Sequence, residues 1–167
     1  MKKIIKNKYN LTDEDITEVV KRVKTLIINS NNEILLAYSN NNYQFIGGHV
    51  EENESLFQTV KREVLEETGI DLEVKDIEPF AVSLGYYKDW PAKGKNRKTI
   101  IYYYEIKTDK KPDLNKTSYT KNEKDGKFEL RIITLNKVKD ELKKNIKEFG
   151  DEKGIIEEML ELFKIYK

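Results

Sequence analysis

The sequence predicts an α+β domain in which helices cover both faces of a mixed β-sheet, an α/β/α layered arrangement. Three observations lead to this prediction. Short runs of β-branched and aromatic residues dominate the first half of the chain, one helix-like stretch at residues 56–68 is inserted among them, and two more helix-like stretches close the chain. Strands that surround one helix and precede others favour helices packed on a sheet. At 167 residues, the chain has the length expected of one domain spanning 1–167.

The first elements expected are a helical segment and a β-hairpin. Residues 12–21 begin with an acidic turn, which is typical of a helix start, and we expect a short helix or helical turn there. Strands are expected at 22–29 and 33–38, because both are rich in Val, Leu and Ile and flank a polar turn. A third strand is expected at 43–46, after another Asn-rich turn.

A helix is expected at residues 56–68. Ser55 and Gln58 have the spacing of a capping box at its start, and Gly69 suits the left-handed residue that ends a helix. At roughly 100° per residue, the apolar side chains share an arc of roughly 100°, the width of a core-facing stripe. The residues in this arc are Leu56, Phe57, Val60 and Val64.

The second half of the chain continues with strands and ends in helices. The expected elements are strands at 72–74, 80–87, 98–106 and 128–135 and helices at 138–147 and 152–166. Residues 107–127 are polar and contain Pro112 and Gly126, so we expect a long mobile loop there. Such a loop could be a substrate lid or a surface insertion, and polar loops are more often surface.

Carboxylates border the apolar stripe of the 56–68 helix. On the same projection Glu67 falls inside the stripe, Glu63 lies just outside it, and Glu66 and then Arg62 follow on that flank. A Glu-rich helix face is usually solvated, but the angular position of these glutamates, beside the apolar stripe, argues otherwise. Carboxylates at a core need a compensating positive charge, or they take up protons.

Arg62 can compensate only part of this charge. It reaches Glu66 at the i, i+4 spacing, whereas Glu63 and Glu67 are also four apart and repel each other. A hard cation such as Mg²⁺, which prefers oxygen ligands and keeps positions for substrate phosphates, would relieve the repulsion. The position of the glutamates around the helix axis therefore predicts a divalent-metal site.

The segment around this helix resembles a known motif. Residues 48–70, GHVEENESLFQTVKREVLEETGI, meet every specified position of the Nudix box, Gly-x5-Glu-x7-Arg-Glu-U-x-Glu-Glu-x-Gly-U, in which U is a bulky aliphatic residue. The resemblance implies the Nudix fold, an α/β/α sandwich with a mixed β-sheet, and a Nudix hydrolase that acts on phosphorus anhydrides.

The resemblance also implies roles for the residues of the box. Mg²⁺ or Mn²⁺ would be the cofactor, Arg62 would orient the glutamates, and Glu54 would assist from the outer shell or through water. The implied metal ligands are the carbonyl of Gly47 and the carboxylates of Glu63, Glu66 and Glu67. Gly48 would let substrate approach the backbone closely. Relatives commonly have a proline before the two glycines, where this chain has Ile46.

The implied reaction is hydrolysis of the diphosphate bond in a nucleoside diphosphate linked to another moiety. Water would attack one phosphorus, and a glutamate would accept its proton. Glu66 or Glu63 is the expected general base. Some relatives take the base from a later loop, where Glu129 is the candidate, although a surface strand residue is the more ordinary interpretation.

Further residues are candidates for substrate contacts. Tyr86, Tyr87 and Trp90 could stack on a base, although aromatic residues in a strand are more often core. His49 could contact phosphate, although a lone loop histidine is usually solvated and is no zinc site.

Two alternatives to the general activity stay open. One is a catalytically silent Nudix-like sensor that binds nucleotides. The other is a narrower enzyme, a dinucleoside polyphosphate hydrolase or an oxidised-nucleotide hydrolase. Enzymes acting on nucleic acid are disfavoured, because 31 basic and 30 acidic residues give a net charge of +1.

Composition sets the remaining expectations. The chain has no cysteine, which removes disulfides and thiol catalysis and suits a reducing compartment. It also has no apolar run of signal-peptide or membrane-span length. We therefore expect a cytoplasmic protein with a small-molecule nucleotide diphosphate substrate and neither DNA nor a membrane as partner. Many relatives are homodimers, so a homodimer is possible.

Overall fold

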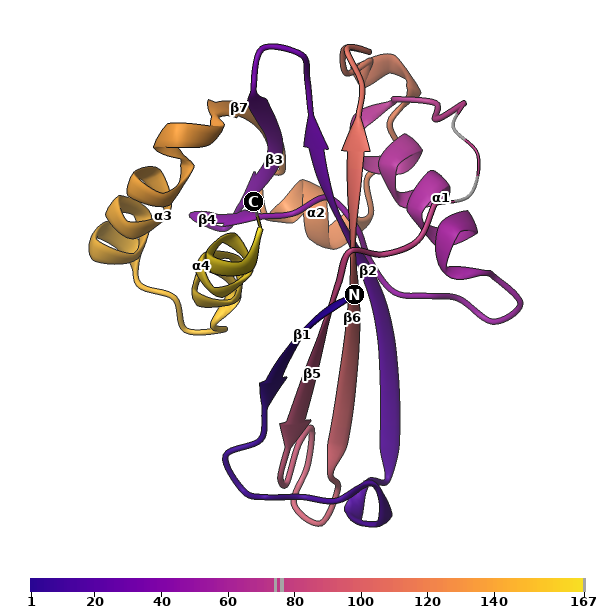
Figure 1. Ribbon diagram of the computed structural model, residues 1–167, viewed down its shortest axis with the longest axis vertical. Coiled ribbons are helices and arrows are strands. Elements are labelled where there is room, and N and C mark those ends of the chain that lie inside the picture. Colours follow the sequence, from indigo (N-terminus) through magenta and orange to yellow (C-terminus); the bar gives the residue numbers. More distant parts are fainter. Residues whose placement is uncertain (74, 76, 167) are drawn as a thin grey trace.

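A mixed β-sheet forms the middle layer of the chain (Figure 1). The computed structural model describes residues 1–73, 75 and 77–166, and within them the sheet has seven strands. The strands are β1 (Lys2–Lys6), β2 (Glu18–Ile28), β3 (Glu33–Ser39), β4 (Asn42–Gln44), β5 (Ala81–Tyr87), β6 (Arg97–Lys107) and β7 (Glu129–Thr134). Their order is β1-β5-β6-β2-β3-β4, and β7 also pairs with β3. The β1–β5 and β2–β6 pairs are parallel and the others antiparallel, so the expected mixed sheet is confirmed.

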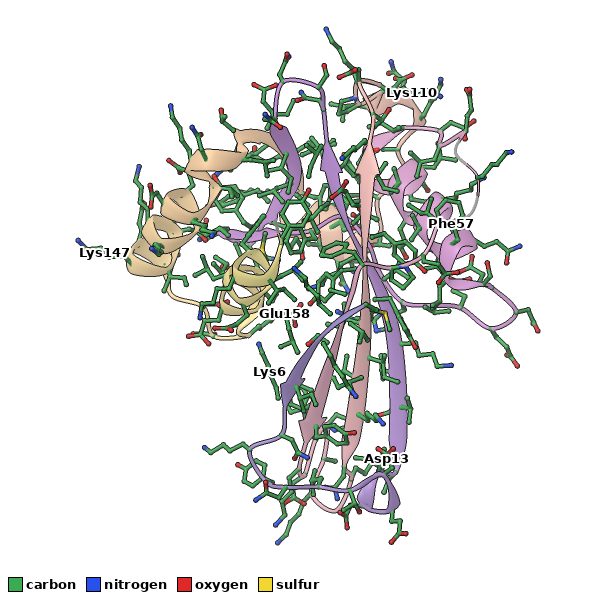
Figure 2. All side chains as sticks on the ribbon, viewed as in Figure 1. Lys6, Asp13, Phe57, Lys110, Lys147 and Glu158 are labelled. Carbon is green, nitrogen blue, oxygen red and sulfur yellow. The ribbon has the colours of Figure 1, made fainter. Side chains whose placement is uncertain are left out.

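Helices cover the sheet on both faces. The helix α1 (Leu56–Thr68) lies on one side, and α3 (Leu135–Phe149) and α4 (Ile155–Ile165) lie on the other (Figure 1). Phe57 on α1 and Glu158 on α4 accordingly occupy opposite sides of the sheet in Figure 2. The short helix α2 (Lys121–Asp125) and the 3₁₀ turns η1 (Asp13–Asp15) and η2 (Leu114–Lys116) lie in connections. The α/β/α sandwich is thereby confirmed.

The two-residue period of the strands divides the core in two. Along β2, Val23 and Ile27 point to the α1 side and pack with Val60 and Val64. Leu26, on the other face, belongs to a second cluster that contains residues of α3 and α4, among them Leu142, Met159 and Phe163. β2 is buried on both faces over residues 23–28, which fixes the position of anything attached to its edge.

The capping signals around α1 predicted its bounds to the residue. The Ser55 side chain accepts a hydrogen bond from the Gln58 N–H, the Gln58 side chain accepts one from the Ser55 N–H, and Gly69 ends the helix at φ 71°. Phe57, Val60 and Val64 are buried as expected, and Leu56 is partly buried.

Two N-terminal elements differ from expectation. The helix expected at 12–21 is wrong beyond its first turn, because Thr12 and Asp15 close only the 3₁₀ turn η1 and β2 begins at Glu18. The β-branched Val19 and Val20 favour the strand, which pairs in parallel with β6. β1 was not expected at all; it is a short strand at the sheet edge beside β5.

Segment 107–127 is more structured than expected. It contains η2 and α2 and makes several hydrogen bonds to α1. Leu72 and Glu73 form no strand, and the third residue of that expected strand, Val74, lies outside the described residues. Within the residues that the structure describes, no helix has the length and apolar character needed to span a membrane.

Candidate active site

A turn at Gly47 and Gly48 is tied to the edge of β2. The backbone hydrogen bonds that tie it are Thr25 N–H to Ile46 O (2.8 Å), Val23 N–H to Gly48 O (3.0 Å) and Val50 N–H to Lys21 O (3.0 Å). Gly47 has φ 141°, and a Cβ there would lie 2.2 Å from the Val23 carbonyl oxygen. Only glycine fits this position, so the loop is held by close packing although Ile46 replaces the proline of relatives.

Glu67 meets this turn from α1. The carboxylate Oε2 accepts a hydrogen bond from the Gly47 N–H at 3.0 Å, and the residue is 6% exposed. Burial raises the pKa of Glu67 well above its ordinary value; the Gly47 N–H opposes the shift, whereas the charges of Glu63, Glu123 and Glu66 add to it. Among the described residues no cation pairs with Glu67. A buried carboxylate is therefore held in place without a counter-charge.

Glu63 lies against the next residue of the same turn. A Cβ on Gly48 would lie 2.3 Å from Glu63 Oε1, so the carboxylate is packed on the Gly48 backbone. Its side chain is 12% exposed. Burial raises the pKa of Glu63, the Arg62 guanidinium works against that shift, and Glu66 and Glu123 add to it. Glu67 thus faces Gly47, and Glu63, one helical turn earlier, faces Gly48.

Arg62 contacts carboxylates on α1 and in the loop before it. Its Nε and Nη2 donate to Glu54 at 2.7 and 3.0 Å, and its Nη1 donates to Glu63 at 2.8 Å and to Glu66 at 3.2 Å. Its Nη2 also donates to the His49 carbonyl at 3.0 Å. The hydrogen bond from Arg62 lowers the pKa of Glu54 to about 2. Arg62 therefore orients three glutamates and leaves Glu67 without a cation.

Segment 107–127 closes the end of α1. The last four carbonyls of a helix have no partner within it, and here all four are satisfied. The partners are Gly69 N–H for Leu65 O (2.8 Å), Ser118 N–H for Glu66 O (2.8 Å), Tyr119 hydroxyl for Glu67 O (3.3 Å) and Asp113 N–H for Thr68 O (2.9 Å). Three of these donors come from one segment, which fixes the turn that carries Glu66 and Glu67.

The same segment brings another carboxylate to the site. Glu123 lies on α2, and its charge contributes to the raised pKa values of both Glu63 and Glu67. A capping box with Thr120 holds Glu123 at the start of α2, where Glu123 Oε2 accepts the Thr120 N–H. The sequence offered only this Thr120–Glu123 spacing, which says nothing about which surface α2 covers.

The donor set suits a hard divalent cation in its chemistry. The two carboxylates that face the turn, Glu63 and Glu67, offer oxygen ligands, and the buried Glu67 lacks a counter-charge. Within the described chain, however, no three His, Cys, Asp or Glu side chains are gathered closely enough to hold a metal as they stand. Glu63 and Glu66 are turned to Arg62. The residues fit such an ion, and Arg62 is the cation that would compete with it for Glu63 and Glu66.

Other expected site residues have different partners. The His49 ring accepts hydrogen bonds from the Arg22 guanidinium at 3.0 and 3.1 Å, while only its carbonyl meets Arg62. Burial lowers the pKa of His49, and Arg22 and Arg97 lower it further. The ring is therefore occupied as an acceptor. Arg22 is a site neighbour, and no motif in the sequence supports a role for it.

The remaining candidates lie on other elements than α1. Glu129, on β7, pairs with Arg131 on the same strand. The Tyr86 hydroxyl donates to Asp13 at 3.1 Å. Tyr87 and Trp90 line a pocket at the far end of β5, where both are exposed. The structure thus brings Gly47, Gly48 and the box glutamates together and separates them from Trp90.

Comparison with known proteins agrees with this geometry. Residues 20–153 match the model of the family described as NUDIX domain. The sequence has no significant match among curated proteins.

Solved structures with a similar chain fold include two MutT proteins and an Ap4A hydrolase. The MutT protein of Bacillus halodurans has a TM-score of 0.51 at 20% identity, covering 72% of each chain. The MutT protein of Methanosarcina mazei Go1 has a TM-score of 0.48 at 24% identity, covering 72% of this chain and 80% of that one. The Ap4A hydrolase of C. elegans has a TM-score of 0.49 at 17% identity, covering 88% of this chain and 99% of that one. At these identities the likeness concerns the fold.

Proposed function

This chain belongs to the Nudix family. We propose that it is a pyrophosphohydrolase that cleaves the diphosphate bond of a nucleoside diphosphate linked to another moiety, at Glu63, Glu66 and Glu67. The observation that carries the proposal is the Glu67 carboxylate, buried against Gly47 with no cation beside it in the described chain. Such a group is destabilising in the metal-free protein and useful when a cation binds.

The glutamates would hold Mg²⁺ or Mn²⁺ together with the Gly47 carbonyl. A bound divalent ion supplies positive charge that neutralises the diphosphate and makes nearby water more acidic. Arg62 competes for Glu63 and Glu66 in the metal-free protein and keeps their carboxylates close to the turn. Held in this way, the carboxylates are already ordered beside the turn, which limits the entropy lost when an ion binds.

The Gly47–Gly48 turn would bind the diphosphate from the other side. Its backbone is fixed to β2 by hydrogen bonds, so its peptide groups are held in place before a phosphate approaches. Arg22 lies at the same edge, with a guanidinium that has a neutral imidazole as its partner and no carboxylate among the described residues. It is available to a phosphate oxygen.

A carboxylate near the reacting water would accept its proton. Glu66 is our first candidate, because its side chain is 39% exposed and lies on the outer flank of the site. Glu123 is the second, because its charge acts on both Glu63 and Glu67. From the later segment we prefer Glu123 to Glu129, because the Glu123 charge acts on Glu63 and Glu67, whereas Glu129 pairs with Arg131 on its own strand.

A substrate panel tests this proposal. Sugar nucleotides, nucleoside triphosphates, dinucleotides and dinucleoside polyphosphates are incubated with Mg²⁺, and released phosphate and nucleoside monophosphate are measured. We expect turnover of at least one class by the wild-type protein and none by Glu67→Gln. Nucleotide binding by calorimetry without turnover of any class would instead indicate a silent sensor and overturn the proposed hydrolysis.

A further inference from the structure

A second pocket lies at the tip of the sheet, away from α1. β1 and β5 are parallel, so their carboxyl ends point the same way, toward the lower end of the molecule in Figure 1. The ends of these two strands and the segments after them border an open pocket of about 390 Å³. This volume falls within the roughly 300 to 1,000 Å³ common for small-molecule sites. We call it the tip pocket.

Three exposed aromatic side chains line the tip pocket. Tyr9 follows β1, and Tyr87 and Trp90 come from the end of β5 and the loop after it. Tyr9 and Trp90 are each 55% exposed, and Tyr87 is 43% exposed. Single exposed apolar residues are ordinary, whereas three large rings around one hollow indicate a binding surface. Flat rings of this kind accept any base, because every base has a π-face.

The charge around the tip pocket is positive. Lys6, Lys8 and Lys88 line it, and Figure 2 shows Lys6 beside the lower half of β1. No described residue forms an ion pair with any of these three lysines, and no carboxylate is among the described residues that line the pocket. The Lys8 and Lys88 ammonium groups lie 5.8 and 6.0 Å from the centre of the Tyr9 ring. Unpaired cations beside stacking surfaces favour an aromatic ligand that carries a negative charge.

Hydrogen bonds hold both walls of the pocket. The Asn7 side chain exchanges two hydrogen bonds with the Leu11 backbone, at 2.7 and 2.9 Å. The backbone N–H of Trp90 donates to the Lys95 carbonyl at 2.7 Å, and the backbone N–H of Gly94 donates to Asp89 Oδ1 at 2.7 Å. Walls fixed before binding reduce the entropy lost when a ligand enters.

We propose that the tip pocket binds a nucleotide, with the base on the aromatic rings and the phosphate at the lysines. A base alone would leave the lysines unused, and phosphate alone would leave the rings unused. The site is separate from the glutamates and does not depend on the proposed hydrolysis. Its nucleotide could be a free mononucleotide or the distal end of a longer substrate held at Glu63 and Glu67.

Trp90 provides a direct readout, because it is the only tryptophan of the chain. AMP is titrated into the wild-type protein in EDTA, and binding is followed by Trp90 fluorescence and by calorimetry. We expect saturable binding of AMP, with adenosine and ribose 5-phosphate each bound roughly tenfold more weakly or worse. Binding of ribose 5-phosphate as tight as that of AMP, or no AMP binding by either method in the millimolar range, overturns the proposal.

Matched variants separate the pocket from general electrostatics. The test variant combines Lys8→Glu with Lys88→Glu at the pocket. The control variant combines Lys144→Glu with Lys147→Glu on α3, far from the pocket, and changes the net charge by the same amount. We expect the first pair, and Tyr9→Ala, to weaken AMP binding roughly tenfold or more, and the α3 pair to leave it within about twofold. Equal effects of the two lysine pairs would contradict a specific site.

The glutamate variant keeps this test apart from the hydrolysis. Glu67→Gln should bind AMP as the wild-type protein does, whatever its activity. The affinities of this variant for diadenosine tetraphosphate and for AMP are then compared. If diadenosine tetraphosphate binds much more than twofold more tightly than AMP, the pocket holds the distal nucleotide of a longer substrate. Near-equal affinity identifies a site for free nucleotide. Loss of AMP binding in Glu67→Gln would place the nucleotide at the glutamates instead and refute the tip pocket.

Discussion

The Glu67 carboxylate accepts a hydrogen bond from the Gly47 N–H at 3.0 Å, which joins the buried flank of α1 to the glycine turn on β2. The contact brings an acidic group to a place where burial raises its pKa well above the ordinary value. One backbone N–H does not balance a buried negative charge. The Glu67 carboxyl group must therefore either take up a proton or be balanced by a bound cation.

Replacing Glu67 separates function from folding. Glu67→Gln keeps the size of the side chain and an oxygen that can accept the Gly47 N–H, but removes the charge. We expect activity with Mg²⁺ to fall roughly 100-fold or more, the scale on which loss of one charge-stabilising group acts. In EDTA at neutral pH the variant should unfold at the wild-type temperature or above it, because an uncompensated charge is gone. Thermal unfolding followed by circular dichroism measures this, and a large drop in the midpoint would contradict it.

Metal-free stability should fall as pH rises. The pKa values of Glu63 and Glu67 are raised in the folded protein by burial. A carboxyl of this kind stabilises the fold fully below its unfolded value, near 4.5, and loses that contribution as pH rises through the folded value. Urea unfolding in EDTA should therefore give a lower free energy of unfolding at pH 8 than at pH 5.5. Mg²⁺ should recover the loss, and the Glu67→Gln variant should show a weaker dependence on pH.

Arg62 should resist conservative replacement. Its guanidinium contacts Glu54 twice and reaches Glu63 and Glu66, a fork that an ammonium group cannot reproduce. We expect Arg62→Lys to lower the free energy of unfolding by about 1 to 3 kcal/mol. Arg97→Lys, at a pair with the more exposed Glu18, should cost less than about 1 kcal/mol and serves as the control. Equal costs in urea unfolding would refute the role of the fork.

The glycine turn should tolerate no side chain at its first position. In Gly47→Ala the new Cβ would lie 2.2 Å from the Val23 carbonyl, and φ 141° disfavours any residue but glycine. We expect a loss of about 3 kcal/mol or more, since both a backbone clash and a strained dihedral are introduced. Gly94→Ala, at φ 81° in open space, should cost about 1 to 2 kcal/mol. Chemical denaturation compares the two, and a Gly47→Ala variant as stable as Gly94→Ala would be inconsistent with this packing.

Removal of the Glu123 charge tests the second candidate base. Glu123→Gln should reduce kcat and shift the acidic limb of the pH–rate profile if Glu123 accepts the proton, with KM changed little. Glu66→Gln should do so if Glu66 is the base. Glu129→Gln is the control, because Glu129 is paired with Arg131. A pH–rate profile unchanged in both Glu66→Gln and Glu123→Gln would exclude both residues.

Local signals in the sequence predicted the parts of this structure that local physics decides. Ser55, Gln58 and Gly69 set the bounds of α1, and the helical period placed Glu67 on the buried flank, where it is 6% exposed. The same logic failed at residues 12–21, because an acidic turn that suits a helix start also closes a single 3₁₀ turn.

Contacts between distant segments were beyond such signals. β1 pairs with β5, and the paired residues lie 79 positions apart in the sequence. No local signal in Lys2–Lys6 predicts that pairing. Glu123 reaches the site only because Asp113, Ser118 and Tyr119 dock on the end of α1. The tip pocket likewise exists only because two parallel strands end together. These features depend on topology rather than on any one stretch of sequence.

The most direct test of the central claim is calorimetric titration of Mn²⁺ into the metal-free wild-type protein and into Glu67→Gln under the same conditions. Burial of an unbalanced carboxylate at Gly47 predicts saturable binding to the wild-type protein and affinity at least roughly tenfold weaker in the variant. Equal affinities in the two proteins, or no binding to the wild-type protein, would contradict a cation site built on Glu67.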